Sequence, residues 1–349
     1  MGNRSSKSGA AHEFLYNKFP AKPCKDYDIG STCRRSGWTV SKQSREKVSG
    51  YAVMAEYWNK VTTKKELENL AGVYQTFTNT NHPHIVKLRQ VFRLTKEKYV
   101  FITENYQNMD LFDIIVSKNN TMSEEQAARY TYQLLSAVLH LHQLGIVHRD
   151  IKPEWAYFRD PECTHILLHP GPFSSSTEGS RSGGIPSDQG RISIPGGTST
   201  QGGTSTQGGN ITQGSTNTQV GTSSTGNISR GGSTFGGTSR RSQFCGTLSY
   251  MAPEIANRKE SGIGVDCWSV GVTVFVMLSG TLPFTGSTDT ETLALVQRGE
   301  YEFHEEYWKN RSGESRDFLR RLLTVDPSQR ITCEEALGHP WITNHGLKD

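Results

Sequence analysis

The sequence lacks paired cysteines, long apolar runs and a strong excess of either charge. Its six cysteines are scattered without a Cys-x-x-Cys motif, so neither a disulfide framework nor a metal site is expected. The longest apolar run, VDCWSVGVTVFVMLSG from Val265, is shorter than the about 18 residues of a membrane-spanning helix and predicts a buried helix. The net charge of +4 is spread along the chain, so no nucleic-acid partner is expected.

Residues 1–25 predict a flexible leader with a lipidation signal. The start MGNRSSK fits the pattern M-G-x-x-x-[ST], in which Gly2 accepts myristate. The segment has no apolar core of a secretory signal peptide. Because one myristoyl chain anchors only marginally, we expect a cytoplasmic protein with reversible membrane contact through Gly2.

The remainder of the chain is divided by a change in residue pattern. Short β-branched and aromatic runs such as YAVMAEY and KYVFITE predict strands before residue 105, and helical periodicity dominates after it. The segment TMSEEQAARYTYQLLSAVLHLHQLG predicts an amphipathic helix that begins after Ser123 and ends at Gly145.

Residues 174–243 predict a long disordered insertion. Glycine, serine, threonine and glutamine dominate there, with GGTSTQ repeated at 196 and 202 and GGNITQ at 208. These repeats hold too few apolar side chains to offset the entropy of ordering them.

Several motifs follow in order: HPHIVKL, VFITENYQNMDLFDII, GIVHRDIKP, GTLSYMAPE, VDCWSVGVTVFVMLSGTLPF and VDPSQRITCEEALGHPWI. Together they resemble a protein kinase domain of the calmodulin-dependent kinase group. The resemblance implies an α+β, bilobal kinase-like fold over 26–347, with a small β-rich N-lobe (26–105), a larger helical C-lobe (106–347) and the insertion in the activation segment. It also implies a Glu254–Arg330 pair and an Asp266 that supports the catalytic loop.

The resemblance further implies that groups needed to hold nucleotide phosphates are absent. Arg34, Ser36 and Thr39 stand where the family has the glycines of its phosphate loop, and side chains there obstruct close backbone approach. Met54 replaces the phosphate-binding lysine of the third strand, and Val73 replaces the glutamate that orients it.

Both positions that ligate magnesium in the family differ as well. Trp155 occupies the place of the catalytic-loop asparagine, and Pro170 occupies the place of the aspartate of the D-F-G motif. Asp150 and Lys152 match the family's base and its phosphate-contacting lysine, but alone they predict no competent catalysis. We therefore expect a pseudokinase that is not an enzyme and has no metal site.

The hinge is better preserved. Thr103, Glu104 and Tyr106 match the segment whose backbone reads adenine in the family, although Tyr157 replaces a small residue that packs against adenine. No cofactor is expected, and weak metal-independent ATP binding stays open.

The leading hypothesis is a pseudokinase scaffold or allosteric regulator in signalling, whose partners are proteins such as an active kinase or its substrates. The stretches VDCW, GEYEF and QRIT are similar to those of calmodulin-kinase-like vesicle-associated pseudokinases. Calmodulin binding itself is not expected, because no segment for a calmodulin-binding helix follows HPWI.

Two alternatives stay open. One is an active Ser/Thr kinase that uses ATP with a relocated basic residue, such as Arg34, Arg35 or Lys42. The other is a docking protein controlled by phosphorylation of the insertion, where RRS at 240–242 suits a basophilic kinase.

Overall fold

The structure is a computed structural model that describes residues 26–35, 39–58, 73, 78, 80–95, 98–118, 121–171, 175–176 and 247–345. All of the described residues belong to one compact unit of the chain. The leader with Gly2 and nearly all of the predicted insertion at 174–243 lie outside the described residues.

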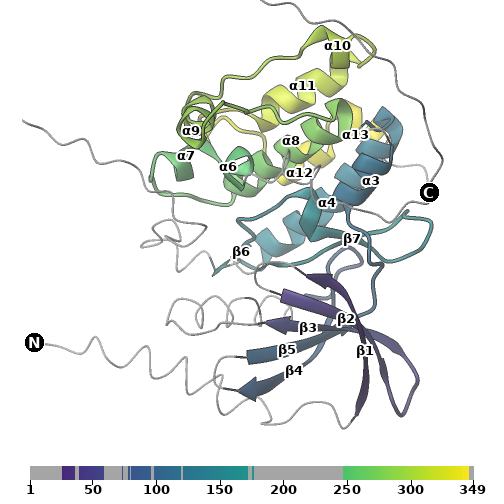
Figure 1. Cartoon of the computed structure of the whole chain (residues 1–349). Coiled ribbons are helices and arrows are strands. Elements are labelled where there is room, and N and C mark those ends of the chain that lie inside the picture. The colour runs from purple at the N-terminus through teal and green to yellow at the C-terminus, as the bar shows by residue number, and fades with distance from the viewer. Residues whose placement is uncertain are drawn as a thin grey trace, which may run out of the picture. The chain divides into compact units, whose positions relative to one another are not determined.

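The first part of the chain forms a five-stranded antiparallel sheet with the order β1-β2-β3-β5-β4 (Figure 1). Its strands are β1 (Tyr27–Arg35), β2 (Thr39–Glu46), β3 (Ala52–Trp58), β4 (Leu88–Thr95) and β5 (Lys98–Glu104). The predicted strands YAVMAEY and KYVFITE are β3 and β5. Both faces of the central strand β3 are covered, because Val53 to Glu56 are all buried.

The edge strand β1 pairs irregularly with β2. Register shifts occur between Ile29 and Thr32 and between Thr32 and Arg34. A Cβ at Gly30 would lie 2.1 Å from the carbonyl oxygen of Gln43, so only glycine allows the two backbones to approach this closely.

The second part is helical. Its helices are α3 (Leu111–Ser117), α4 (Glu124–Gln143), α6 (Thr247–Tyr250), α7 (Pro253–Ala256), α8 (Gly264–Ser279), α9 (Asp289–Arg298), α10 (Glu305–Trp308), α11 (Gly313–Leu322), α12 (Cys333–Leu337) and α13 (Pro340–His345). The predicted fold is confirmed: a β-rich N-lobe is followed by a larger helical C-lobe.

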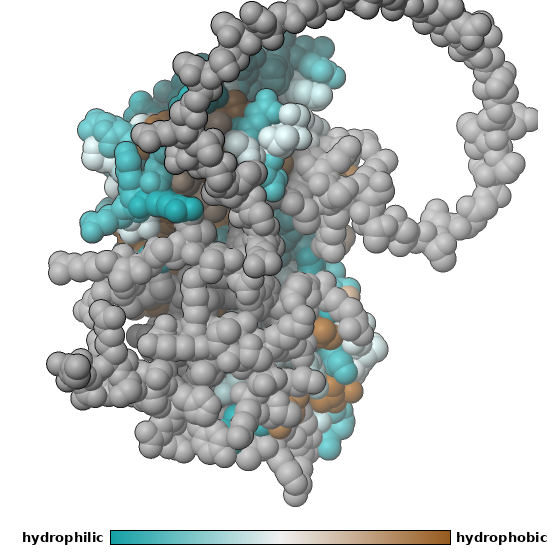
Figure 2. All heavy atoms as spheres, turned by 60° about the vertical axis from the view of Figure 1, so that its left-hand side comes forward, coloured by the Kyte–Doolittle hydropathy of each residue, from teal (hydrophilic) through white to brown (hydrophobic). Residues whose placement is uncertain are grey.

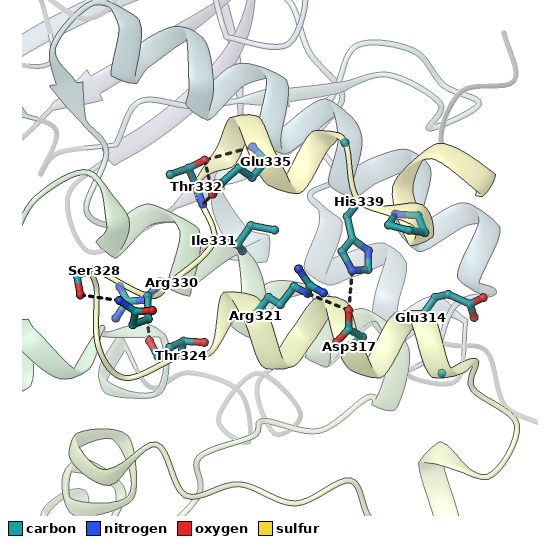
Figure 3. Close-up of a pocket in the computed structure, with 14 residues that line it drawn as sticks. Glu314, Asp317, Arg321, Thr324, Ser328, Arg330, Ile331, Thr332, Glu335 and His339 are labelled. Carbon is teal, nitrogen blue, oxygen red and sulfur yellow. Dashed lines mark hydrogen bonds and ion pairs between the residues drawn. The ribbon is translucent and has the colours of Figure 1, made fainter.

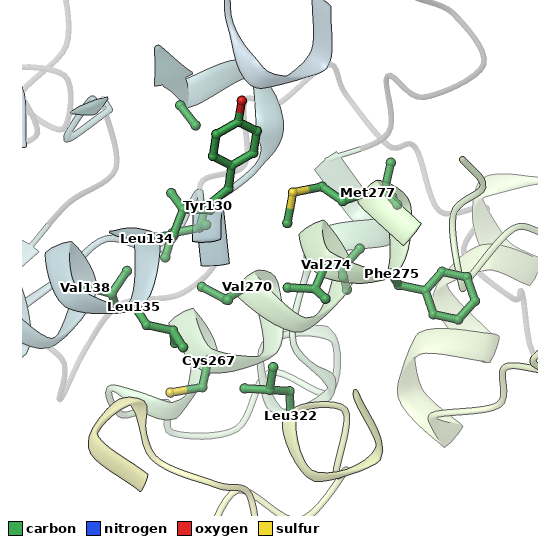
Figure 4. Close-up of a cluster of buried hydrophobic side chains, with 14 of the residues drawn as sticks. Tyr130, Leu134, Leu135, Val138, Cys267, Val270, Val274, Phe275, Met277 and Leu322 are labelled. Carbon is green, nitrogen blue, oxygen red and sulfur yellow. The ribbon is translucent and has the colours of Figure 1, made fainter. Parts of the chain in front are cut away.

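The C-lobe core lies between α4 and α8 (Figure 4). Ser123 caps α4 by accepting a hydrogen bond from the Gln126 amide, and Gly145 follows the helix with a φ of 69°. Along α4 the predicted apolar face is buried: Ala127, Tyr130, Leu134, Val138 and Leu141. Helix α8 is buried on every side from Val265 to Ser279, as its unbroken apolar sequence predicts.

Short strands frame the loop between the lobes. They are β6 (Ile146–Val147), paired with β9 (Ser175–Ser176), and β7 (Ala156–Phe158), paired with β8 (Ile166–Leu168). The turn η1 (Pro153–Trp155) leads into β7. These pairs fix both ends of residues 148–155, which contain the predicted catalytic loop.

The described surface is mainly polar on the face that Figure 2 shows. In Figure 2 hydrophilic residues cover much of the visible described surface, and hydrophobic patches are small. The most exposed large apolar side chains, Val48 and Tyr51, lie in and next to the turn between β2 and β3. No helix in the described part of the chain combines the length and apolar character that a bilayer crossing requires.

Candidate functional site

Asp266 holds the predicted catalytic loop from α8. Its carboxylate accepts hydrogen bonds from the amides of His148 (2.9 Å) and Arg149 (2.8 Å). It also bonds the ring of His142 at 2.8 Å. Burial opposes its ionisation, but these donors lower the pKa of Asp266 below its ordinary value. The left-handed φ of 67° at Arg149 is held in place by this contact.

Glu254 and Arg330 form the pair that the resemblance implies. The guanidinium donates to both carboxylate oxygens, at 2.8 and 2.9 Å, with both side chains almost fully buried. Arg330 also donates to the carbonyls of Thr324 and Gly264. This bidentate contact ties α7 to the loop before α12.

Asp150 has both carboxylate oxygens engaged within its own loop. The indole N–H of Trp155 donates to Oδ2 at 2.6 Å, and the Lys152 ammonium lies 3.1 Å from Oδ1. Asp150 is 5% exposed. Trp155 therefore directs its only side-chain hydrogen-bond donor at the side chain that matches the family's base.

Met54 and Val73 occupy the same apolar cluster. Both side chains are fully buried. Val73 is helical, as expected from its resemblance to the kinase position that holds the lysine-orienting glutamate. The Cys33 thiol lies 3.7 Å from the Met54 sulfur. Two positions expected to hold an ion pair in the family thus make apolar contacts here, an exchange that costs little when both partners change together.

Glu56, which the sequence analysis missed, lies two residues beyond Met54 and is 1% exposed. It accepts a hydrogen bond from the Tyr106 hydroxyl at 2.7 Å and one from His169 Nε2 at 2.8 Å. Burial raises its pKa, but His169 and Tyr106 outweigh this and lower the pKa of Glu56. The contact joins β3 of the N-lobe to the residue before Pro170.

The hydrogen bonds of His169 determine its tautomer. The Gly171 amide donates to Nδ1 at 3.0 Å, so Nδ1 is an acceptor. The ring proton is therefore on Nε2, which donates a hydrogen bond to Glu56. The carbonyl of His169 accepts from His148 Nε2 at 2.8 Å. The segment around Pro170 is thereby fixed to the catalytic loop.

Arg34 reaches from β1 to the start of α3. Its guanidinium is hydrogen-bonded to the buried carboxylate of Asp110 and lies 3.8 Å from Asp113. It also lies over the Tyr157 ring, 5.1 Å from the centroid. Asp110 and Asp113 form a capping box at the N-terminus of α3. Burial raises the pKa of Asp110 to about 6, although Arg34 acts in the opposite direction.

These contacts join into one path between the lobes. The rings of Tyr157 and Tyr106 stack at 4.5 Å, and those of His169 and Trp155 at 5.0 Å. We call the connected side chains the interlobe network: Asp110, Arg34, Tyr157, Tyr106, Glu56, His169, Trp155 and Asp150.

The remaining hinge residues make local contacts. Thr103 is buried and donates to the carbonyl of Glu104 at 3.1 Å. The Glu104 carboxylate accepts from the Lys87 amide and lies 3.3 Å from Arg159. Ser36 and Gly2 lie outside the described residues, and Thr39 is placed only as the first residue of β2.

Glu154 carries a buried atom without a partner. Its Oε2 has no hydrogen bond within the described residues. Burial raises the pKa of Glu154 to about 7, with Asp110 and Asp150 adding to the effect and Lys152 opposing it. A carboxyl group in this position is partly protonated at neutral pH.

The C-lobe contains a separate open pocket of about 880 Å³ between α11 and α12 (Figure 3). Asp317 bonds both Arg321 (2.9 Å) and His339 (3.0 Å), and Thr332 caps α12 together with Glu335. Most of its polar groups are therefore paired with one another.

A family model described as "Protein kinase domain" matches residues 39–158 and 231–342. The chain belongs to the protein kinase family. Myosin light chain kinase A of Dictyostelium discoideum is 31% identical over 322 residues, which are 92% of this chain and 89% of the relative. Calcium/calmodulin-dependent protein kinase type 1 of Macrobrachium nipponense is 29% identical over 82% of this chain and 67% of the relative. The serine/threonine-protein kinase H1 homolog of Pinctada fucata is 28% identical over 99% of this chain and 68% of the relative.

These relatives support the predicted likeness to the calmodulin-dependent kinase group and correct another prediction. The expectation that the chain is not an enzyme is wrong by this comparison, because the relatives that align with most of it are named as kinases. None of these three is named as a vesicle-associated pseudokinase, so that narrower likeness stays a prediction.

The family implies a magnesium nucleotide, and the described side chains at these positions do not fit one. Met54 has no hydrogen-bond donor, the carboxylate of Glu56 is bound by two donors of this chain, and the indole of Trp155 is no metal ligand. Within the described ranges no group of three or more His, Cys, Asp or Glu side chains is arranged to hold a metal ion.

Proposed function

We propose that this protein kinase domain acts in signalling as a scaffold or allosteric regulator, and that this role depends on contacts with protein partners and not on a bound magnesium nucleotide. The observation that supports it is the interlobe network. Tyr106 and Tyr157 are almost fully buried in their mutual stack, and Glu56 is committed to Tyr106 and His169.

The physical reason is competition for the same groups. A nucleotide between the lobes has to separate the Tyr106–Tyr157 stack and provide other partners for Arg34 and Asp150. Each buried polar group left without its partner costs about 1–3 kcal/mol, so the internal contacts oppose ligand entry. The partners we propose are proteins, such as an active kinase or its substrates.

The second candidate is phosphoryl transfer from ATP to serine or threonine. The names of the relatives favour it, as does the placement of Lys152 beside Asp150. The relocated basic residue that this reading requires is not provided by Arg34, which is paired with Asp110, or by Lys42, whose ammonium lies over the Tyr57 ring.

Phosphate incorporation tests the second candidate. The purified full chain and its Asp150→Asn variant are incubated with ATP, magnesium and a library of serine and threonine peptides. Incorporation by the wild type that is lost in Asp150→Asn would establish phosphoryl transfer. The regulatory proposal predicts that partner proteins bind equally well with and without magnesium-bound ATP, and partner binding that requires magnesium-bound ATP would reject it.

We also propose reversible membrane contact through myristoylated Gly2, on the basis of the MGNRSSK motif. Intact mass after co-expression with an N-myristoyltransferase tests it, with Gly2→Ala as the control. An unshifted wild-type mass would remove this part of the proposal. Phosphorylation of the insertion remains a prediction from its sequence, and deletion of residues 174–243 tests whether it controls partner binding.

A further inference from the structure

The interlobe network contains one described side chain from β1, and that side chain is Arg34. The other members lie on β3, in the hinge, at the start of α3 or in the segment 150–169. Strand β3 is paired on both sides, and strand β7 within 150–169 pairs with β8. The start of α3 packs in the C-lobe core. Strand β1 is at the edge of the sheet and its pairing with β2 is irregular near Arg34. Irregular edge strands open more readily than central strands.

The Arg34 contact is built to hold this strand down. Asp110 is fully buried, and Arg34 is 13% exposed at its side chain, so the ion pair is shielded from water and salt. Asp113 adds a second carboxylate at 3.8 Å, and Tyr157 provides an aromatic face for the guanidinium. Charge-assisted hydrogen bonds of this kind are stronger than neutral ones.

We propose that Arg34 and Asp110 form a latch that holds β1 over the interlobe network, and that opening of this latch is the motion that uncovers the stacked rings of Tyr106 and Tyr157. The latch is a conformational device of this chain. It does not depend on whether the domain transfers phosphate or regulates a partner.

Cys33, the neighbour of Arg34, reports on the latch directly. Its thiol is half-buried, lies 3.3 Å from the Ser41 carbonyl and touches Met54 beneath the strand. Cys163 in the C-lobe is also half-buried and serves as an internal control. Burial raises the pKa of both thiols, so their basal reactivity is low.

The experiment measures the rate at which N-ethylmaleimide labels each cysteine of the full chain, resolved by peptide mass. The variants are Arg34→Gln and Asp110→Asn, because asparagine keeps the N-cap of α3 while removing the charge. The matched control is Arg45→Gln, an arginine of β2 whose guanidinium, among the described residues, donates to the turn carbonyl of Gly50.

Both latch variants should increase Cys33 labelling about 10- to 100-fold, the range that one charge-assisted hydrogen bond contributes to an opening equilibrium. Labelling of Cys163 should change less than about twofold, and Arg45→Gln should resemble wild type. The double variant should label no faster than the faster single variant, since both changes break one contact.

Three results would overturn the latch. The first is unchanged Cys33 labelling in either variant. The second is a parallel rise at Cys163, which indicates global loosening. The third is multiplication of the two effects in the double variant, which indicates that Arg34 and Asp110 act separately.

Discussion

Replacing Glu56 with alanine should lower the free energy of unfolding by about 2–6 kcal/mol. The carboxylate accepts from Tyr106 and from His169, and all three side chains are at most 1% exposed. Alanine leaves two buried donors without an acceptor, at about 1–3 kcal/mol each. Relief of a buried charge offsets part of this loss, so the lower half of the range is expected.

The assay is urea unfolding of the full chain, followed by circular dichroism, in a double-mutant cycle with Tyr106→Phe. In the Tyr106→Phe background, Glu56→Ala leaves one buried donor without an acceptor instead of two. The loss of unfolding free energy caused by Glu56→Ala should therefore be smaller by about 1–3 kcal/mol. The exposed Glu125→Ala serves as a control and should change stability by less than about 1 kcal/mol. Additivity of the Glu56 and Tyr106 changes within about 0.5 kcal/mol would refute the argument, because it would mean that the two groups do not share a hydrogen bond.

Glu154→Gln should remove a pH dependence of the unfolding free energy. Folding raises the pKa of Glu154 from 4.5 to about 7, so between these values the folded state keeps a proton that the unfolded chain releases. The unfolding free energy of the wild type therefore falls by about 3 kcal/mol as the pH rises through this window. Urea unfolding at pH 5 and pH 8 checks this, and an equal pH slope in both proteins would contradict it. Glu254→Gln should destabilise the fold by about 3–5 kcal/mol, because Arg330 stays buried without its carboxylate. Glu125→Gln, at an exposed ion pair, should cost under about 1 kcal/mol. Similar urea midpoints for the two variants would contradict the argument that burial makes the Glu254 pair the stronger one. Gly30→Ala should speed hydrogen exchange of the β1 amides, since its Cβ would lie 2.1 Å from a backbone oxygen of β2, and unchanged exchange would show that the strand moves aside easily.

Local pattern was sufficient for most of the fold. Helix α4 is predicted by the spacing of its apolar residues and by its Ser123 cap, and helix α8 by its unbroken apolar sequence. These signals depend on residues within a few helical turns of one another, and the structure contains both helices. The pairing of Glu254 with Arg330 and the role of Asp266 followed from the resemblance to protein kinases and not from spacing.

The interlobe network was not predictable in the same way. Strand alternation suggests an outward Glu56, but β3 is central and covered on both faces, so the side chain is buried. Its partner His169 is 113 residues away, and Arg34 is 76 residues from Asp110. Such non-local pairs leave no periodic signal. From the sequence, Trp155 is therefore interpreted only as a loss, and Arg34 as a loss or as a relocated basic residue, although the structure gives each a specific partner.

We propose that this chain's own side chains hold the groups between the lobes that a magnesium nucleotide would otherwise contact. A thermal-unfolding titration of the purified full chain with ATP, with and without Mg²⁺, tests it most directly. We predict a melting temperature that does not rise with magnesium-bound ATP. A magnesium-dependent rise that grows with ligand as RT ln(1 + [L]/Kd) would contradict it.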